Sequence, residues 1–249
     1  MWVLTLFIPC MEQRDEESGQ GEVKFSRTGL ISGLRESTPI ALGVFTYGIV
    51  FGVLARQSSL GLSEAVLMSA SVFAASAQFV VLDLWESPLP VIAIVVTTVA
   101  VNLRHLLMGA SIQPWLKRLA PKKTYGMLYF LNDESWGLTM RARSNGENDA
   151  AFLLGSGLIV FVAWISATVL GVSVGGLIEN PAKYGLDMAF IAVYIALLVG
   201  VWDGREDAIP IGIAALVALV ASVIIAGNWY IIIGGLTGSI AGVVRDEYA

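Results

Sequence analysis

The chain has 249 residues, of which 56% are hydrophobic and only 14% are charged, and its mean hydropathy is +0.73. Ordinary soluble domains carry roughly 25% charged residues, so this composition excludes a water-soluble globular domain. The formal net charge of −5 and the lack of a basic stripe argue against a nucleic-acid partner, and the single cysteine, Cys10, excludes an internal disulfide.

Long stretches without Asp, Glu, Lys or Arg dominate the sequence. They are residues 39–55, 65–82, 88–103, 150–178 and 208–244. A lipid bilayer with a core about 30 Å thick requires about 20 apolar residues in a helix, and several of these stretches reach that length. Strands of a membrane barrel would alternate polar and apolar residues, which these stretches do not. The sequence therefore predicts an all-α, polytopic integral membrane protein, a helical bundle of about seven membrane segments within a range of roughly 6–8.

The first 26 residues are rich in acids and are expected to form a disordered N-terminal tail. The acidic residues of this tail are Glu12, Asp15, Glu16, Glu17 and Glu22. Met11 is an alternative start of translation. Residues 27–249 are expected to form a single transmembrane domain.

The predicted segments follow one another from residue 39 to residue 244. They are residues 39–55, 65–84, 91–112, 124–140, 150–172, 186–202, 208–226 and 229–244. The fourth is only moderately apolar, and Gly227-Asn228 predicts a tight turn between the last two. Glycines at a spacing of four residues, at positions 48 and 52 and at positions 234, 238 and 242, indicate faces for close helix packing.

Basic residues give conflicting signals about the orientation of the chain. Lys24, Arg27 and Arg35 precede the first segment and predict a cytoplasmic N-terminus under the positive-inside rule. The basic loop at residues 117–123 should then also be cytoplasmic, yet three complete crossings would place it outside. A broken or re-entrant early segment removes the conflict, and transporters place such interrupted helices at their binding sites. A misplaced segment boundary is the alternative.

Asn102, Arg104 and His105 stand late in an otherwise apolar segment and are candidates for substrate binding or proton coupling. An arginine inside a membrane helix costs roughly 2.5–3.5 kcal/mol, so it usually faces protein or a water-filled cavity. Arg104 could pair with a substrate carboxylate or with Asp133 or Glu134, and His105, with an unperturbed pKa near 6.5, suits proton transfer. The alternative is that Arg104 extends to the cytoplasmic headgroups.

Two further groups of polar residues are candidates for the same site. Asp133 and Glu134 are adjacent acids that could bind an ammonium group or carry protons. If their segment is interfacial, the two carboxylates are merely solvated. Gln78 offers a donor and an acceptor within apolar surroundings, so it could contact a zwitterion or hydrogen-bond a neighbouring helix.

Sequence motifs of enzymes are missing from the chain. It has no GxxxxGK[ST] phosphate loop, no HExxH motif and no GxSxG motif, and its single histidine and cysteine cannot form a metal cluster. The sequence therefore predicts a protein that is not an enzyme, without a cofactor and without a bound metal.

Several short groups of residues occur in a specific order and spacing. They are Gly29-Leu30, residues 39–45, Tyr47-Gly48, Phe73 with residues 76–79, residues 102–105 and residues 132–135. In this order they resemble the AzlC-type permease family, the large subunit of two-component branched-chain amino acid exporters. The resemblance runs from about Phe25 to Arg245. Thr46 departs from the pattern, because the family has proline there more often, so a proline kink in the first helix does not carry over.

The resemblance implies a secondary transporter in the cell membrane that exports valine, leucine and isoleucine, and also methionine. It implies proton coupling and a small, separately encoded membrane subunit of the AzlD type. The alternative is a channel-like or scaffold subunit whose small partner carries the specificity. Saturable, stereoselective and pH-dependent transport would separate the two.

Overall fold

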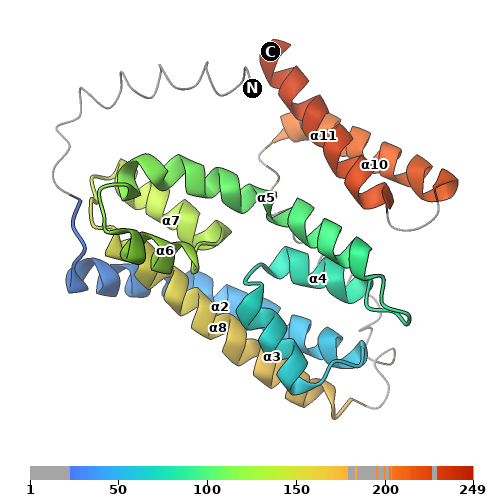
Figure 1. Cartoon of the computed structure of the whole chain (residues 1–249), viewed down its shortest axis with the longest axis horizontal. Coiled ribbons are helices and arrows are strands. Elements are labelled where there is room, and N and C mark those ends of the chain that lie inside the picture. Colours follow the sequence, from blue (N-terminus) through green and yellow to red (C-terminus); the bar gives the residue numbers. More distant parts are fainter. Residues whose placement is uncertain are drawn as a thin grey trace. The chain divides into compact units, whose positions relative to one another are not determined.

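A computed structural model describes residues 23–178, 204–225 and 229–248, together with Lys183, Ile195, Val199 and Trp202. These residues form helices connected by short loops (Figure 1). The helices are α2 (Arg27–Gln57), α3 (Leu62–Ser71), α4 (Ala75–Asp83), α5 (Val91–Leu116), α6 (Pro121–Leu128), α7 (Asp133–Ser144), α8 (Ala151–Gly175), η3 (Arg205–Asp207), α10 (Ala208–Ile224) and α11 (Trp229–Tyr248). Residues 1–22 of the predicted tail at 1–26, most of the segment at 186–202 and the turn at Gly227-Asn228 lie outside the described residues.

Three of the described helices are long and apolar enough to cross a membrane. They are α2 with 31 residues, α5 with 26 and α8 with 25. At a rise of about 1.5 Å per residue, each exceeds the roughly 30 Å of a hydrocarbon core. The predicted fold class, an all-α membrane bundle, is confirmed, whereas about seven complete crossings stay a prediction.

The chain divides into two compact units. One comprises Met1–Thr38 and Gly109–Ile159, and the other comprises Pro39–Met108 and Val160–Ala249. Helices α2, α5 and α8 contribute residues to both units. The single permease domain that the sequence predicts from residue 27 onwards stays a prediction.

The predicted segment at 65–84 is interrupted, so the broken early segment is confirmed. Helix α3 ends at Ser71 and α4 begins at Ala75 (Figure 1). The interruption contains no glycine or proline. Ser71 donates from its hydroxyl to the Leu67 carbonyl at 2.7 Å, the kind of local bond that competes with continuation of a helix, and Val72 leaves the helical region with φ −119° and ψ 78°.

The predicted segment at 124–140 is also two helices, α6 and α7, and its prediction as one continuous segment was wrong. Asn132 ends the first half because it caps α7. Its side-chain oxygen accepts from the Ser135 backbone N–H at 2.7 Å, and its own N–H donates to the Ser135 hydroxyl at 3.0 Å. This reciprocal cap fixes the start of α7 at Asp133.

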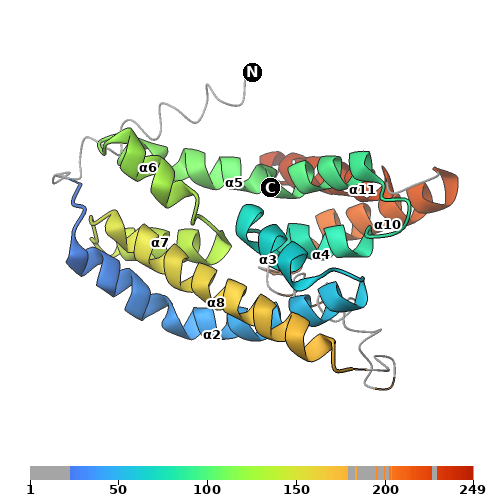
Figure 2. The same ribbon diagram turned by 60° about the horizontal axis from the view of Figure 1, so that its bottom comes forward.

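In the unit that contains Pro39–Met108, the core is aromatic and fixes α4 in place. Phe51 from α2 stacks on Trp164 from α8, with ring centroids 5.4 Å apart. Phe79 from α4 packs edge-on against Phe51 at 5.6 Å, and all three side chains are at most 1% exposed. Figure 2 shows α8 running beside α2. Gly48 permits this approach, because a Cβ there would lie 2.7 Å from the Cβ of Ala167.

In the other unit, one buried carboxylate fastens the first turns of α2 and α8. Asp149 is 5% exposed and accepts from the backbone N–H of Ala151 at 3.0 Å. It also accepts from the backbone N–H of Ser26 at 3.1 Å and from the Ser26 hydroxyl. That hydroxyl in turn accepts from the Gly29 N–H at 3.1 Å, which caps α2. Asp149 thereby joins two helix starts that are distant in the sequence.

Replacing Asp149 by alanine is expected to destabilise the folded protein by about 2–4 kcal/mol, because it removes a charged acceptor from several buried or partly buried donors. We expect the unfolding temperature of the detergent-solubilised variant to be several degrees lower than that of the wild type. Glu36→Ala serves as the control, since Glu36 accepts one exposed bond from Ser32 and its loss should be nearly neutral. Equal unfolding temperatures for the Asp149→Ala variant and the wild type would contradict the role of this carboxylate.

Candidate functional site

The interruption between α3 and α4 places two helix ends close together in the chain. The last turn of α3 has carbonyl groups without intrahelical partners and carries partial negative charge. Helix α4 begins after Ala74, which provides no side-chain cap, so its first N–H groups carry partial positive charge. Paired helix ends of this kind bind ions and charged substrates in transporters.

Arg104 from α5 reaches the positive end of α4. Its guanidinium donates to the hydroxyl of Ser76, the second residue of α4, and the Arg104 side chain is partly buried. The arginine therefore adds a full positive charge at a helix start that already favours anions. This placement suits a carboxylate.

Gln78 lies in the first half of α4 and is 1% exposed. Its side-chain oxygen accepts from the Ser69 hydroxyl at 3.2 Å, and its side-chain NH₂ donates to the Val72 carbonyl. Ser69 also contacts the hydroxyl of Thr168 on α8 at 3.1 Å. Both functional ends of the Gln78 amide are thus bonded within the protein, as in the helix-bonding alternative, and its contact with substrate stays a prediction.

Asn102 and His105 accompany Arg104 on α5 and are partly buried. Asn102 donates from its side chain to the Thr98 carbonyl at 2.9 Å, one turn earlier. Residues three apart lie on the same side of a helix, so Asn102 and His105 share a face, whereas Arg104 projects about 100° away from His105. The roles predicted for Asn102 and His105 in substrate binding or proton coupling stay predictions.

Asp133 and Glu134 form the first turn of α7, in the unit that does not contain Arg104. Asp133 is exposed and Glu134 is partly buried. Carboxylates at a helix start are stabilised by the helix dipole, which gives both acids a structural role. The hydrogen bond from the Trp136 indole to the Ser111 hydroxyl, at 2.9 Å, ties this turn of α7 to α5. Pairing of either acid with Arg104 stays a prediction.

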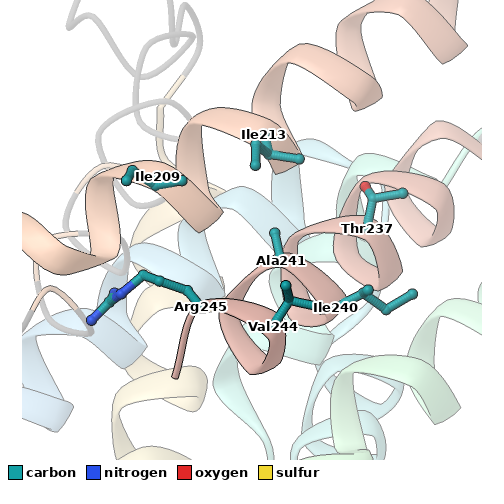
Figure 3. A pocket seen from close by; sticks show the side chains of 7 residues that line it. All are labelled: Ile209, Ile213, Thr237, Ile240, Ala241, Val244 and Arg245. Atoms are coloured by element: carbon teal, nitrogen blue, oxygen red, sulfur yellow. The ribbon is translucent and has the colours of Figure 1, made fainter. Parts of the chain in front are cut away.

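Helices α10 and α11 form an antiparallel pair with an open groove of about 470 Å³ (Figure 3). The groove is lined by Ile209, Ile213, Thr237, Ile240, Ala241, Val244 and Arg245. The Thr237 hydroxyl already donates within its own helix, to the Ile233 carbonyl at 2.8 Å, so the lining is almost entirely apolar. None of the predicted site residues lines this groove. Gly234 and Gly238 pack on Ala218 and Ala214, which confirms the predicted small-residue face.

Sequence reasoning missed Ser69, Ser76 and Thr168. The two serines stand among small residues in 65–84, and small residues in apolar helices commonly serve helix packing. Thr168 gave no signal, because one threonine in an apolar helix commonly bonds to its own backbone.

The long apolar helices α2, α5 and α8, together with the interrupted pair α3 and α4, define a multi-pass helical membrane protein. Interrupted helices of this kind occur in membrane transporters. The sequence model of the AzlC protein family matches residues 39–178, and the chain belongs to this family. General membrane transport is the role that this membership supports. The match begins at Pro39 in α2 and includes the α3–α4 interruption, Arg104 and α7.

The chain is also similar to individual membrane proteins. The chain is 29% identical over 70% of its length to an uncharacterized membrane protein of Archaeoglobus fulgidus, of which 76% is covered. It is 26% identical over 78% of its length to the branched-chain amino acid transport protein AzlC of Bacillus subtilis, again with 76% covered. It is 23% identical over 86% of its length to the inner membrane protein YgaZ of Escherichia coli K12, with 86% covered. No solved structure matches the chain significantly.

Proposed function

We propose that this protein is a secondary transporter that exports branched-chain amino acids across the cell membrane, with its N-terminus in the cytoplasm. The observation that carries the proposal is the α3–α4 interruption, where Arg104 stands at the positive end of α4. The name of the Bacillus subtilis relative, a branched-chain amino acid transport protein, supports the substrate class. Residues 27–249 would act together as one permease domain.

A zwitterion at membrane depth needs both of its charges matched. The substrate carboxylate would bind Arg104 and the first N–H groups of α4, and the ammonium would bind the carbonyl end of α3. Apolar surroundings for a branched side chain are present at the same place. Phe73 lies in the interruption itself and packs edge-on against Phe161 from α8, with ring centroids 5.1 Å apart.

The small membrane subunit expected beside this chain is of the AzlD type. We propose α5 as the helix that contacts it. Only 11% of the 18-residue apolar stretch of α5 is buried, compared with 39% of the corresponding stretch in each of α2 and α8. Several apolar side chains of α5 are strongly exposed, including Ile92 at 75% and Leu107 at 74%. A partner helix would cover them.

The direct test is efflux of labelled L-valine and L-isoleucine from preloaded proteoliposomes, with and without the small subunit and under an imposed pH gradient. Saturable efflux that prefers the L-enantiomer and responds to the gradient is the expected result. Efflux that neither saturates nor distinguishes enantiomers would contradict a transporter and indicate a channel. Efflux of other amino acids alone would contradict the substrate class.

Coupling to protons is proposed to run through His105 and the acids of α7. Replacing both acids, as Asp133→Asn with Glu134→Gln, is expected to lower gradient-driven efflux about tenfold, because the first turn of α7 then has no carboxylate that can exchange protons. Counterflow without a gradient should fall much less. Glu147→Gln is a suitable control, as this acid follows the end of α7. Unchanged gradient dependence in the double variant would remove these acids from the coupling pathway.

A further inference from the structure

We infer that Ser69, Gln78 and Thr168 form a hydrogen-bonded chain that holds the α3–α4 interruption in its binding geometry, with Thr168 as a positioning residue on α8. This inference rests on the proposed function, because it assigns a support to the same site. The three residues come from α3, α4 and α8. The hydrogen-bonded chain therefore joins these three helices through side chains. None of them needs to touch the substrate.

All three side chains of this hydrogen-bonded chain are buried. Ser69 and Thr168 are 0% exposed, and Gln78 is 1% exposed. The Thr168 and Ser69 hydroxyl oxygens are 3.1 Å apart, the Ser69 hydroxyl lies 3.2 Å from the Gln78 side-chain oxygen, and the Gln78 NH₂ reaches the Val72 carbonyl. Hydrogen bonds in such low-dielectric surroundings are strong, and an unmade one is costly. The chain ends at the carbonyl where α3 stops.

The number of available protons fixes which group donates and which accepts in each of these hydrogen bonds. The Val72 carbonyl can only accept, so the Gln78 NH₂ must face it and the Gln78 oxygen must face Ser69. Ser69 has one hydroxyl proton and donates it to Gln78, so the Thr168 hydroxyl must donate to Ser69 to complete the chain. Thr168 has a competing acceptor in its own helix, the Trp164 carbonyl at 2.9 Å. The single hydroxyl proton of Thr168 therefore either completes the hydrogen-bonded chain by bonding to Ser69 or bonds to the Trp164 carbonyl instead.

This arrangement lets Thr168 influence the site without contacting a ligand. With the chain complete, Val72 and the start of α4 keep a fixed separation. Without it, the ordered interruption is populated less often. Apparent affinity falls by the fraction of molecules that are competent to bind, whereas saturating substrate restores the full rate. Replacing a positioning residue of this kind changes KM and leaves the maximal rate unchanged.

Thr168→Val tests the hydroxyl at nearly constant volume. We expect it to raise the KM for L-valine efflux about fivefold without changing the maximal rate, the loss typical of one buried hydrogen bond. Thr168→Ser keeps the hydroxyl and should restore the wild-type KM. Ser173→Ala is the matched control on α8, since among the described residues the Ser173 hydroxyl donates to the Val169 carbonyl of its own helix, and its KM should not change. A wild-type KM for Thr168→Val, or an equally raised KM for Thr168→Ser, would overturn the inference.

A second measurement is independent of transport. Hydrogen–deuterium exchange of the backbone in residues 69–78 should be faster in the full-length Thr168→Val protein than in wild type and in Thr168→Ser. Equal exchange in all three proteins would overturn the chain as a support of the interruption. If the wild type transports no branched-chain amino acid, the proposed function fails, while the exchange comparison still decides whether the chain exists.

Discussion

Replacing Arg104 by alanine is expected to lower L-valine efflux at least about 100-fold while leaving the amount of protein in the membrane unchanged. The guanidinium donates to Ser76 in the first turn of α4, so its removal takes away the one full positive charge that the described contacts place at this helix start. Truncating one member of a desolvated, charged hydrogen-bonded pair typically costs about 2–5 kcal/mol, and each 1.4 kcal/mol is tenfold. Radiolabelled efflux from proteoliposomes measures the loss.

Companion variants separate charge, geometry and position. Arg104→Lys keeps the charge but loses the planar fork, so intermediate efflux is expected. Ser76→Ala removes only the neutral acceptor and should cost less than tenfold. Arg35→Ala removes an exposed arginine from α2 and should leave efflux intact. Normal efflux by correctly inserted Arg104→Ala protein would remove Arg104 from the substrate site and favour the alternative in which it anchors α5 at the headgroups.

The fold class could be predicted from the sequence because lipid imposes a simple rule. Charge-free stretches of sufficient length must form helices, since a bilayer core offers no partners for backbone polar groups. The predicted segments at 91–112 and 150–172 correspond closely to α5 and α8. The conflict among the basic residues also predicted an interruption early in the chain, and α3 and α4 show it between Ser71 and Ala75.

The site was only partly predictable, because its contacts join residues that are distant in the sequence. Arg104 was recognisable as an arginine in an apolar helix, but its Ser76 partner lies 28 positions earlier. Thr168 and Ser69 are 99 positions apart, and no local pattern connects them. The start of α7 was readable in principle, since Asn132 is followed three positions later by Ser135, a hydrogen-bonding pair at capping distance. The prediction of one segment at 124–140 did not take this cap into account.

Close packing of α2 on α8 depends on glycines that face backbone. In the unit with Met1–Thr38, a Cβ on Gly155 would lie 2.1 Å from the Leu30 carbonyl oxygen. The approach is reciprocal, since a Cβ on Gly33 would lie 2.2 Å from the Phe152 carbonyl oxygen. A carbonyl of a helix backbone cannot rotate away as a flexible side chain can. Any side chain at Gly155 must therefore push the two helices apart, and with them the buried 2.7 Å hydrogen bond between Ser37 and Ser156.

Gly155→Val is therefore expected to destabilise the protein by at least about 3 kcal/mol and to reduce its abundance in the membrane about tenfold or more. Fluorescence-detected size-exclusion chromatography of solubilised membranes measures the folded fraction. Gly43→Ala is the matched control in α2, because a Cβ at Gly43 meets no atom of the described residues within 4 Å. Alanine is also the better helix former by about 1 kcal/mol, so this control should be neutral or slightly stabilised. A Gly155→Val protein as abundant and monodisperse as Gly43→Ala would show that α2 and α8 do not pack backbone to backbone at this point.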